Sequence, residues 1–186
     1  DKCVGEVAPG RFEISGACQF PQSWQPKWDL TLQGFKIPLQ KNPSASIFTN
    51  MRLRSTGDLS NSVLSGTIAV VDSRIHDDLH LIPLLSAEPQ QPPYMEFLTA
   101  LLPTFLSPSA QGTLDLSVST AEPIRVGKLP LAGELACDLK LRGSLKAPVP
   151  TGRLTLSNIP LRLSAGRLLM NQGTMEFLSD EPWNPI

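Results

Sequence analysis

The amino-acid sequence predicts a mainly β protein, built as one long, predominantly antiparallel sheet with a single apolar face. Two observations support this fold class. Between residues 132 and 186, leucines recur at every second position in short runs that glycine, proline or asparagine interrupts, as in Leu139 and Leu141. A related pattern of leucine and glycine stands earlier in the chain. Because side chains at i and i+2 share one face of a strand, the runs predict one leucine-coated face and one polar face.

The segment 4–35 is expected to form the first three strands. Apolar residues alternate over 12–18, around Gly16, and again over 28–32. Prolines at both ends of the stretch 21–26 predict a loop between these runs, because proline cannot donate a hydrogen bond to the ladder of a sheet.

A strand pair is expected next, at 47–59 and 63–71. The alternation puts the apolar residues of the first strand, such as Leu53, on one face and those of the second, such as Ile68, on another. Both strands carry glycine close to their apolar residues.

This strand pair is part of an internal repeat. The pattern L-x-x-x-G-x-L, six residues, then G-x-apolar-x-apolar begins at Leu53 and again at Leu139, and a looser copy begins at Phe12. Glycine tolerates backbone conformations that other residues resist, so its recurrence within strand pairs predicts bends or bulges that curl the sheet. Repeats of this kind favour a sheet that grows strand by strand.

The sequence His76-Asp77-Asp78-Leu79-His80 mimics the H-E-x-x-H zinc signature. Zinc binding would need a helix that puts both imidazoles on one face, together with a third protein ligand. Here the segment continues an alternating run that ends before Pro83. We therefore expect a polar strand face or turn and no functional metal site.

The segment 83–111 is predicted to be a linker followed by the one helix of the chain. Its first part is rich in proline and glutamine. The helix is expected near residues 93–102, where apolar side chains recur at helical spacing until Pro103 ends the helix. We expect this stripe to pack on its own protein. Contact with a membrane surface is the alternative, although no lysine or arginine lies between Pro83 and Gly112.

Strand patterning resumes at Gly112 and continues almost to the end of the sequence. Apolar residues alternate over 114–118, 124–126, 129–131 and 135–141, and leucine doublets follow. In total about twelve strands are expected, which at roughly 4.8 Å between neighbours gives an open sheet on the order of 55 Å long. Open sheets of that size usually curl or fold over.

Composition excludes several classes of function. The sequence has 16 basic and 17 acidic residues with neither sign clustered, so no nucleic-acid partner is expected. It contains no G-x-S-x-G turn, phosphate-binding glycine loop or C-x-x-C pair, so we expect no enzyme activity and no cofactor. No run approaches the roughly 18–20 apolar residues of a membrane-spanning helix.

The three cysteines, Cys3, Cys18 and Cys137, cannot all pair within one chain. Cys3 and Cys18 flank the turn-like sequence Ala8-Pro9-Gly10 and could meet across a hairpin. The favoured interpretation is that the cysteines are small buried hydrophobic residues, which leaves the redox compartment open.

The motifs of the C-terminal half occur in a set order. They are Leu139-x-Leu141-x-Gly143-x-Leu145, Pro148, Gly152-Arg153-Leu154-Thr155-Leu156, Gly173-x-Met175-Glu176-Phe177 and Asn184-Pro185-Ile186. In this order they resemble the C-terminal domain of the TamB family of translocation and assembly module proteins, which belong with the AsmA-like envelope proteins. The resemblance is closest over 112–186, and the rest of the chain resembles the family only in its general strand pattern.

The resemblance implies a β-taco, a curved sheet that forms an open half-pipe with an apolar interior. It also implies the periplasmic part of an inner-membrane-anchored protein in a diderm bacterium, with an outer-membrane barrel of the Omp85/TamA type as partner. The closing Asn-Pro-aliphatic motif leads into a further strand in the family. We therefore expect the whole of 1–186 to be one segment cut from a much longer protein.

A set of apolar residues is expected to line the groove and bind phospholipid acyl chains, and no catalytic or metal-binding residue is expected. The set is Leu114, Leu116, Leu139, Leu141, Leu145, Leu154, Leu156, Leu161, Leu163, Met175 and Phe177.

Three functions are left open. The first is phospholipid transport between the inner and outer membranes for envelope biogenesis. The second is a scaffold that receives β-strands of unfolded outer-membrane proteins or autotransporters during their assembly. The third is an ordinary β-sandwich or solenoid adhesin, in which leucines from two sheets would pack together instead of lining a cleft.

Overall fold

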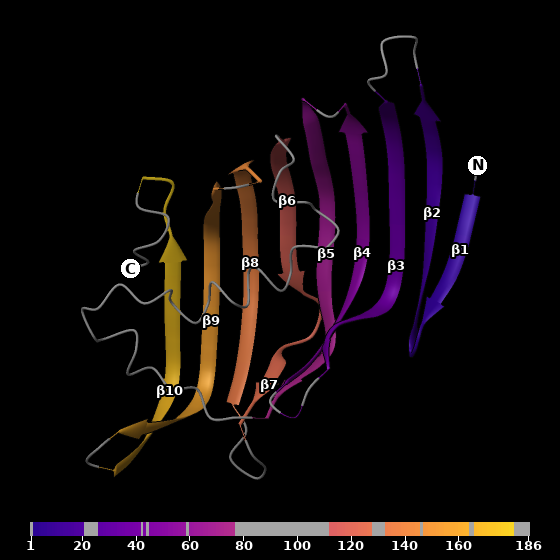
Figure 1. Ribbon diagram of the computed structural model, residues 1–186. Coiled ribbons are helices and arrows are strands. Elements are labelled where there is room, and N and C mark those ends of the chain that lie inside the picture. The colour runs from indigo at the N-terminus through magenta and orange to yellow at the C-terminus, as the bar shows by residue number, and fades with distance from the viewer. Residues whose placement is uncertain are drawn as a thin grey trace.

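The computed structural model describes residues 2–20, 26–41, 43, 45–58, 60–76, 112–127, 133–145, 147–163 and 166–180, with side chains described outside 159–168. Within these residues ten strands form one sheet (Figure 1). The strands are β1 Lys2–Val7, β2 Gly10–Gln19, β3 Lys27–Lys41, β4 Ala45–Gly57, β5 Ser62–Ile75, β6 Gly112–Thr120, β7 Ile124–Val126, β8 Gly133–Ser144, β9 Ala147–Leu163 and β10 Gly166–Phe177.

The strands lie almost in chain order, in the sequence β1-β2-β3-β4-β5-β6-β8-β9-β10, with the short β7 pairing with β5 and β8. All pairs are antiparallel except β5 with β6 and β5 with β7. Parallel neighbours need a crossover of a dozen or more residues, and the interval between β5 and β6 is long enough to supply one. The mainly β, mostly antiparallel prediction is confirmed.

About twelve strands were predicted for the whole chain, and ten lie within the described residues. The leucine doublets at 154–156 and 161–163 both belong to β9, which runs for 17 residues. The predicted strand at 129–131 and the helix at 93–102 fall outside the described residues.

The described strands make one sheet, and no second sheet faces it among them, as an ordinary sandwich would require. None of the described residues lies in a helix that is long and apolar enough to cross a membrane.

The internal repeat is a repeat of structure. In the β4–β5 hairpin Leu53 pairs with Gly66, and in the β8–β9 hairpin Leu139 pairs with Gly152, each residue 86 positions further on. The glycines share a rare backbone conformation, with φ of 143° at Gly66 and 124° at Gly152. A Cβ at either position would overlap a carbonyl oxygen of the neighbouring strand. Only glycine can occupy this point of the hairpin without strain.

The predicted bulges occur, but not at the glycines. Register shifts interrupt the β3–β4 and β4–β5 ladders beside Lys36 and Asp72, and both residues adopt left-handed φ angles of 51° and 44°. Asn158, 86 positions after Asp72, has a φ of 53°. A bulge shifts the alternation by one residue, so buried positions in β5 change from Val70 to Ser73.

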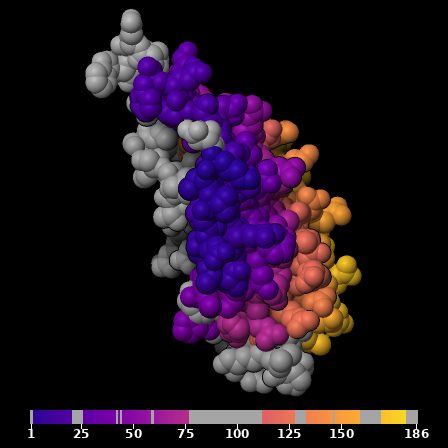
Figure 2. Space-filling model, turned by 90° about the vertical axis from the view of Figure 1, so that its right-hand side faces the viewer, coloured from indigo at the N-terminus to yellow at the C-terminus, as the bar shows by residue number. Residues whose placement is uncertain are grey.

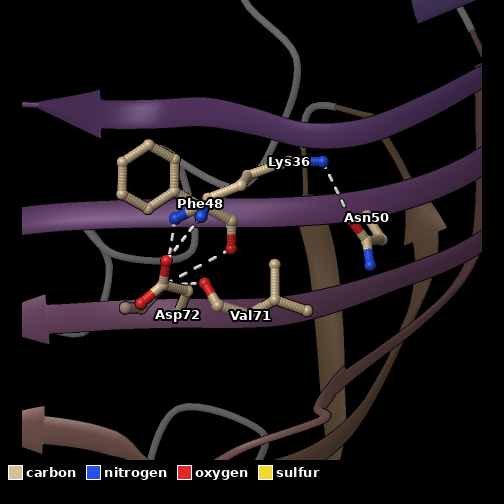
Figure 3. Close-up of polar contacts among 6 residues, drawn as sticks. Lys36, Phe48, Asn50, Val71 and Asp72 are labelled. Carbon is tan, nitrogen blue, oxygen red and sulfur yellow. Dashed lines mark hydrogen bonds and ion pairs between the residues drawn. The ribbon is translucent and has the colours of Figure 1, made fainter. Parts of the chain in front are cut away.

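The bulges of β3 and β5 are joined across β4 (Figure 3). The Lys36 Nζ lies 2.6 Å from the Asp72 carboxylate and 5.7 Å from the ring centre of Phe48. The backbone N–H of Lys36 donates to Asn50 Oδ1 at 2.8 Å. These contacts align the two bulges, and Figure 1 shows β3, β4 and β5 bending together at one end.

Candidate functional site

One side of the sheet, which we call the apolar face, carries a continuous cluster of buried side chains from β4 to β10. The buried side chains of neighbouring strands lie in rows, because residues paired across the strands lie side by side. Leu116 of β6 pairs with Leu141 of β8, and Leu154 of β9 pairs with both Cys137 of β8 and Met175 of β10. Paired residues point to the same side, so the apolar positions of successive strands merge into one surface.

Most of the residues predicted to line a groove lie in this cluster. Leu114, Leu116, Leu139, Leu141, Leu154, Leu156 and Phe177 are buried, with exposed fractions of 0–8%. Leu145 and Met175 are partly buried and pack against the cluster. The side chains of Leu161 and Leu163 lie outside the described ones. In the repeat, Leu161 corresponds to Ile75, which follows the Asp72 bulge and packs against the cluster.

The predicted set omitted the first copy of the repeat. Ile47, Leu53, Ile68 and Val70 of β4 and β5 are as deeply buried as their counterparts in β8 and β9. The 86-residue spacing was the signal that could have placed them, because it aligns Leu53 with Leu139. The face assignment was wrong for this strand pair: Met51 pairs with Ile68, so both strands turn their apolar residues to the same side.

The apolar face is closed to solvent over the centre of the sheet and open at the β1 edge. Leu116 and Val118 have no exposed surface. On the same face, Val7 of β1 is 42% exposed and Leu30 of β3 is 37% exposed. Figure 2, viewed from this edge, shows the side chains of β1 and β2 in indigo facing the viewer. We call the apolar face of β1–β3 the open region.

A family model described as the TamB C-terminal domain matches residues 6–186. The chain belongs to the TamB family. The match includes the N-terminal strands β2–β5, so the TamB resemblance seen over 112–186 extends to nearly the whole chain. Neither a curated protein nor a solved structure matches it. Membership of this family indicates a periplasmic part of an envelope protein.

The opposite side of this TamB domain, the polar face, is crossed by ion pairs between neighbouring strands. The guanidinium of Arg54 in β4 lies 2.7 Å from a carboxylate oxygen of Asp29 in β3. The guanidinium of Arg142 in β8 lies 3.3 Å from a carboxylate oxygen of Asp115 in β6. The hydrogen bond from Arg54 lowers the pKa of Asp29. Side chains in these pairs are half or more exposed. Because exposed ion pairs contribute little to stability, these pairs fix strand register more than they hold the fold.

Two of the three cysteines of the TamB domain are exposed, whereas all three were expected to be buried. Cys3 and Cys18 are exposed and unbridged, and Cys137 is buried. A bridge is ruled out by the register, because Cys3 pairs with Ile14, four residues along β2 from Cys18. At roughly 3.4 Å per residue the separation is about 14 Å, beyond the reach of a disulfide. Burial among apolar residues raises the pKa of the Cys137 thiol to about 11.

The zinc-like motif yields no site within the described residues. His76 Nε2 lies 3.5 Å from Ser46 Oγ, and the other four residues of the motif fall outside the described ranges. Across the described part of the chain, no three His, Cys, Asp or Glu side chains are grouped to hold a metal ion.

Proposed function

We propose that this TamB domain shelters phospholipid acyl chains along its apolar face during lipid transport between the inner and outer membranes, in the service of outer-membrane biogenesis. One observation carries the proposal: the apolar face is continuous from strand to strand and becomes accessible to solvent at the open region. Such a face would give the domain an apolar track and a place where a ligand could enter it.

The proposed curvature of the sheet has a physical basis in the bulges. Lys36 and Asp72 take left-handed conformations at register shifts within long strands, and bulges of this kind bend a strand and increase its twist. Bends toward the apolar face would wrap the sheet into a half-pipe with an apolar interior. Such a half-pipe would shield an acyl chain from water on three sides.

Apolar contact alone supplies enough free energy for this work. Each methylene withheld from water is worth about 0.8 kcal/mol, so covering most of a roughly 16-carbon chain gives on the order of 10 kcal/mol. Transport also requires that the chain slide without a large barrier. A floor of aliphatic side chains that repeats from strand to strand meets this requirement, because each position along the floor is nearly equivalent.

The open region offers the best place to test the proposal. Leu141 and Leu156 are buried, so a charge at either position would destabilise the packed cluster, and any loss of lipid would then reflect the lost stability. Val7→Asp and Leu30→Asp place a charge on half-exposed positions of the same face. Val63→Asp is the matched control, because Val63 is 44% exposed on the polar face.

We expect lipid to co-purify with the wild-type domain and the Val63→Asp control, as measured by native mass spectrometry, and to be several-fold depleted in the other two variants. Circular dichroism checks that all four proteins keep the sheet. The proposal fails if the wild-type domain is lipid-free under conditions that keep a known lipid carrier loaded. It also fails if all three variants retain lipid equally.

A second candidate function rests on the sheet edges. β1 and β10 end the described sheet, and each pairs with only one strand there. We propose as the alternative that an edge receives a β-strand of an unfolded outer-membrane protein, or of an outer-membrane barrel of the Omp85/TamA type. Hydrogen exchange with and without a client-strand peptide tests it. Strand addition protects amides of β1 or β10, and exchange unaffected by the peptide would exclude it.

For the placement in the cell, we propose the periplasmic part of an inner-membrane-anchored protein in a diderm bacterium. Family membership supports this placement. Fractionation of cells that produce the full-length protein tests it: the protein should follow the inner membrane, with this domain cleaved by protease only after the outer membrane is opened.

A further inference from the structure

A cleft of about 530 Å³ lies on the polar face, over the strands from β1 to β5. Its walls include Val4, Arg11, Phe35, Asn50, Arg52 and Thr67. Strand register places these side chains on the side opposite the apolar cluster: Arg52 pairs with Thr67, and its neighbours Met51 and Leu53 are buried in that cluster. The cleft is therefore separate from the surface proposed to hold acyl chains.

The sequence creates the hollow through the bulge in β3. The β3–β4 ladder is regular up to Gly34 and resumes at Ile37, with Lys36 in the left-handed conformation between them. A bulge bends its strand and increases the local twist of the sheet. Phe35 stands immediately before this bulge and pairs with Arg11 of β2, so both side chains border the hollow.

Two cations of the cleft lack an ion-pair partner within 4.0 Å among the described residues, although Glu6 of β1 stands across from Arg11 in the ladder. Within the described residues neither Arg11 nor Arg52 forms an ion pair, whereas Arg54, two residues on, is held by Asp29. The carboxylate in the cleft, Glu13, is neutralised by Lys2 at 2.9 Å.

The side-chain amide of Asn50 adds a donor to these cations. Its Oδ1 accepts from the Lys36 N–H, so its amide NH₂ group remains to donate (Figure 3). Two guanidinium groups and an amide in one cleft form a site for an oxyanion, because arginine matches the oxygens of phosphate with paired donors.

The same cleft has exposed apolar walls. Val4 is 65% exposed and Phe35 is 56% exposed, although Phe35 also supports the Arg11 guanidinium 5.8 Å from its ring centre. Large apolar side chains beside a cationic site suit a ligand that has both an anionic group and an apolar part. Inorganic phosphate alone would leave these walls in water.

We propose that this cleft binds a phosphoryl group that carries an apolar substituent, as in an anionic phospholipid. The phosphoryl oxygens contact Arg11, Arg52 and the Asn50 amide, and the apolar substituent covers Phe35 and Val4. The site lies on the polar face, so it does not depend on whether the apolar face holds acyl chains.

Isothermal titration of the purified chain tests the proposal with three probes: inorganic phosphate, dihexanoyl phosphatidylglycerol below its micellar concentration, and dihexanoyl phosphatidylcholine. We expect the anionic lipid to bind about tenfold more tightly than inorganic phosphate or the zwitterionic lipid, and its affinity to fall as salt rises. Equal binding of inorganic phosphate and the anionic lipid would overturn the assignment of an apolar substituent.

Variants separate this site from the apolar face. Arg11→Gln with Arg52→Gln is expected to weaken binding of the anionic lipid by about tenfold or more. The control Arg142→Gln removes an arginine of the polar face outside the cleft and is expected to leave binding unchanged. Binding that Leu30→Asp abolishes and the arginine variants preserve would overturn the cleft proposal and support the apolar face alone.

Discussion

At the scale of single residues, the backbone conformation of Asp72 explains why a polar side chain stands within a long strand. Its φ of 44° lies in the left-handed region, which asparagine and aspartate tolerate better than other residues with a Cβ. The repeat supports this explanation, because Asn158 occupies the equivalent place with a φ of 53°. Asp72 has a second feature besides its backbone conformation, which is the ion pair with Lys36. The hydrogen bond from Lys36 lowers the pKa of the Asp72 carboxyl.

A pair of variants separates the two features of Asp72. Asp72→Asn keeps a residue suited to the conformation and removes only an exposed ion pair, so we expect it to lower the free energy of unfolding by less than about 1 kcal/mol. Asp72→Val places a β-branched residue in the left-handed region and should cost about 1–3 kcal/mol. Urea unfolding measures both. Equal losses would mean that the ion pair, and not the backbone conformation, holds this bulge.

The cysteines give a prediction of reactivity. Cys3 and Cys18 are exposed, whereas Cys137 is buried and the pKa of its thiol is raised to about 11. We expect a thiol reagent at pH 8 to label two cysteines rapidly in the folded chain and the third only after unfolding. Mass mapping identifies the protected residue. Rapid labelling of Cys137 would show that the centre of the apolar face opens to solvent.

The same thiol predicts a dependence of stability on pH. The Cys137 thiol ionises near its ordinary value of 9.0 in the unfolded chain and near 11 in the folded chain. Folding is therefore favoured below pH 9, and this stabilisation is lost as pH rises through 9 to 11, by up to roughly 3 kcal/mol. Cys137→Ala should flatten the decline in urea-unfolding midpoint over that range. An unchanged decline would assign it to other groups.

At the scale of strands and hairpins, the sequence predicted the elements well wherever the alternation was uninterrupted. The strands of both repeat copies follow from spacing alone, and so does the leucine face of the second copy. What spacing could not show is the phase change at a bulge, because a one-residue shift moves every later side chain to the other face. The doublets at 154–156 and 161–163 lie in one strand, β9, although the first falls on even positions and the second on odd ones. Asn158, between them, has a left-handed backbone conformation.

The repeated glycines predict a matched pair of effects. Gly152 has a φ of 124°, and an added Cβ would overlap the carbonyl oxygen of Asp138. We expect Gly152→Ala to lower the free energy of unfolding by about 2–3 kcal/mol. Gly173→Ala is the control: its Cβ would meet the flexible side chain of Met170 at 2.7 Å, which can move aside. Chemical denaturation of both variants measures the difference, and equal losses would contradict the conformational explanation.

At the scale of the whole molecule, the family could be recognised from sequence but the shape of the binding surface could not. Motif order in the C-terminal half pointed to the TamB family, and the family match extends this to 6–186. Leu116 is buried and Leu30 is exposed, although both lie in runs that alternate apolar and polar residues. The difference depends on which parts of the sheet are covered, and the alternation does not show this. The cleft on the polar face could not be predicted either, since it requires Arg11, Phe35 and Arg52 from three strands to meet at a bulge.

The uneven burial of the apolar face predicts an uneven stability across the sheet. The cluster joins β4 to β10, whereas β1 and β2 contribute no buried apolar side chain to it. Opening free energy rises with the number of buried apolar contacts. We therefore expect backbone amides of β1 and β2 to exchange with deuterium orders of magnitude faster than those of β5, β6 and β8, through local opening at the β1 edge.

Two substitutions check that this gradient comes from the cluster. Leu141→Arg puts a charge at a position that is 1% exposed, so it should accelerate exchange throughout β4–β10 together. Val7→Asp, at a position that is 42% exposed, should accelerate exchange in β1 and β2 alone. Exchange is followed by mass spectrometry of peptides. Uniform protection from β1 to β10 in the wild-type chain would contradict the gradient, and would also remove the open region as the place where a lipid enters the apolar face.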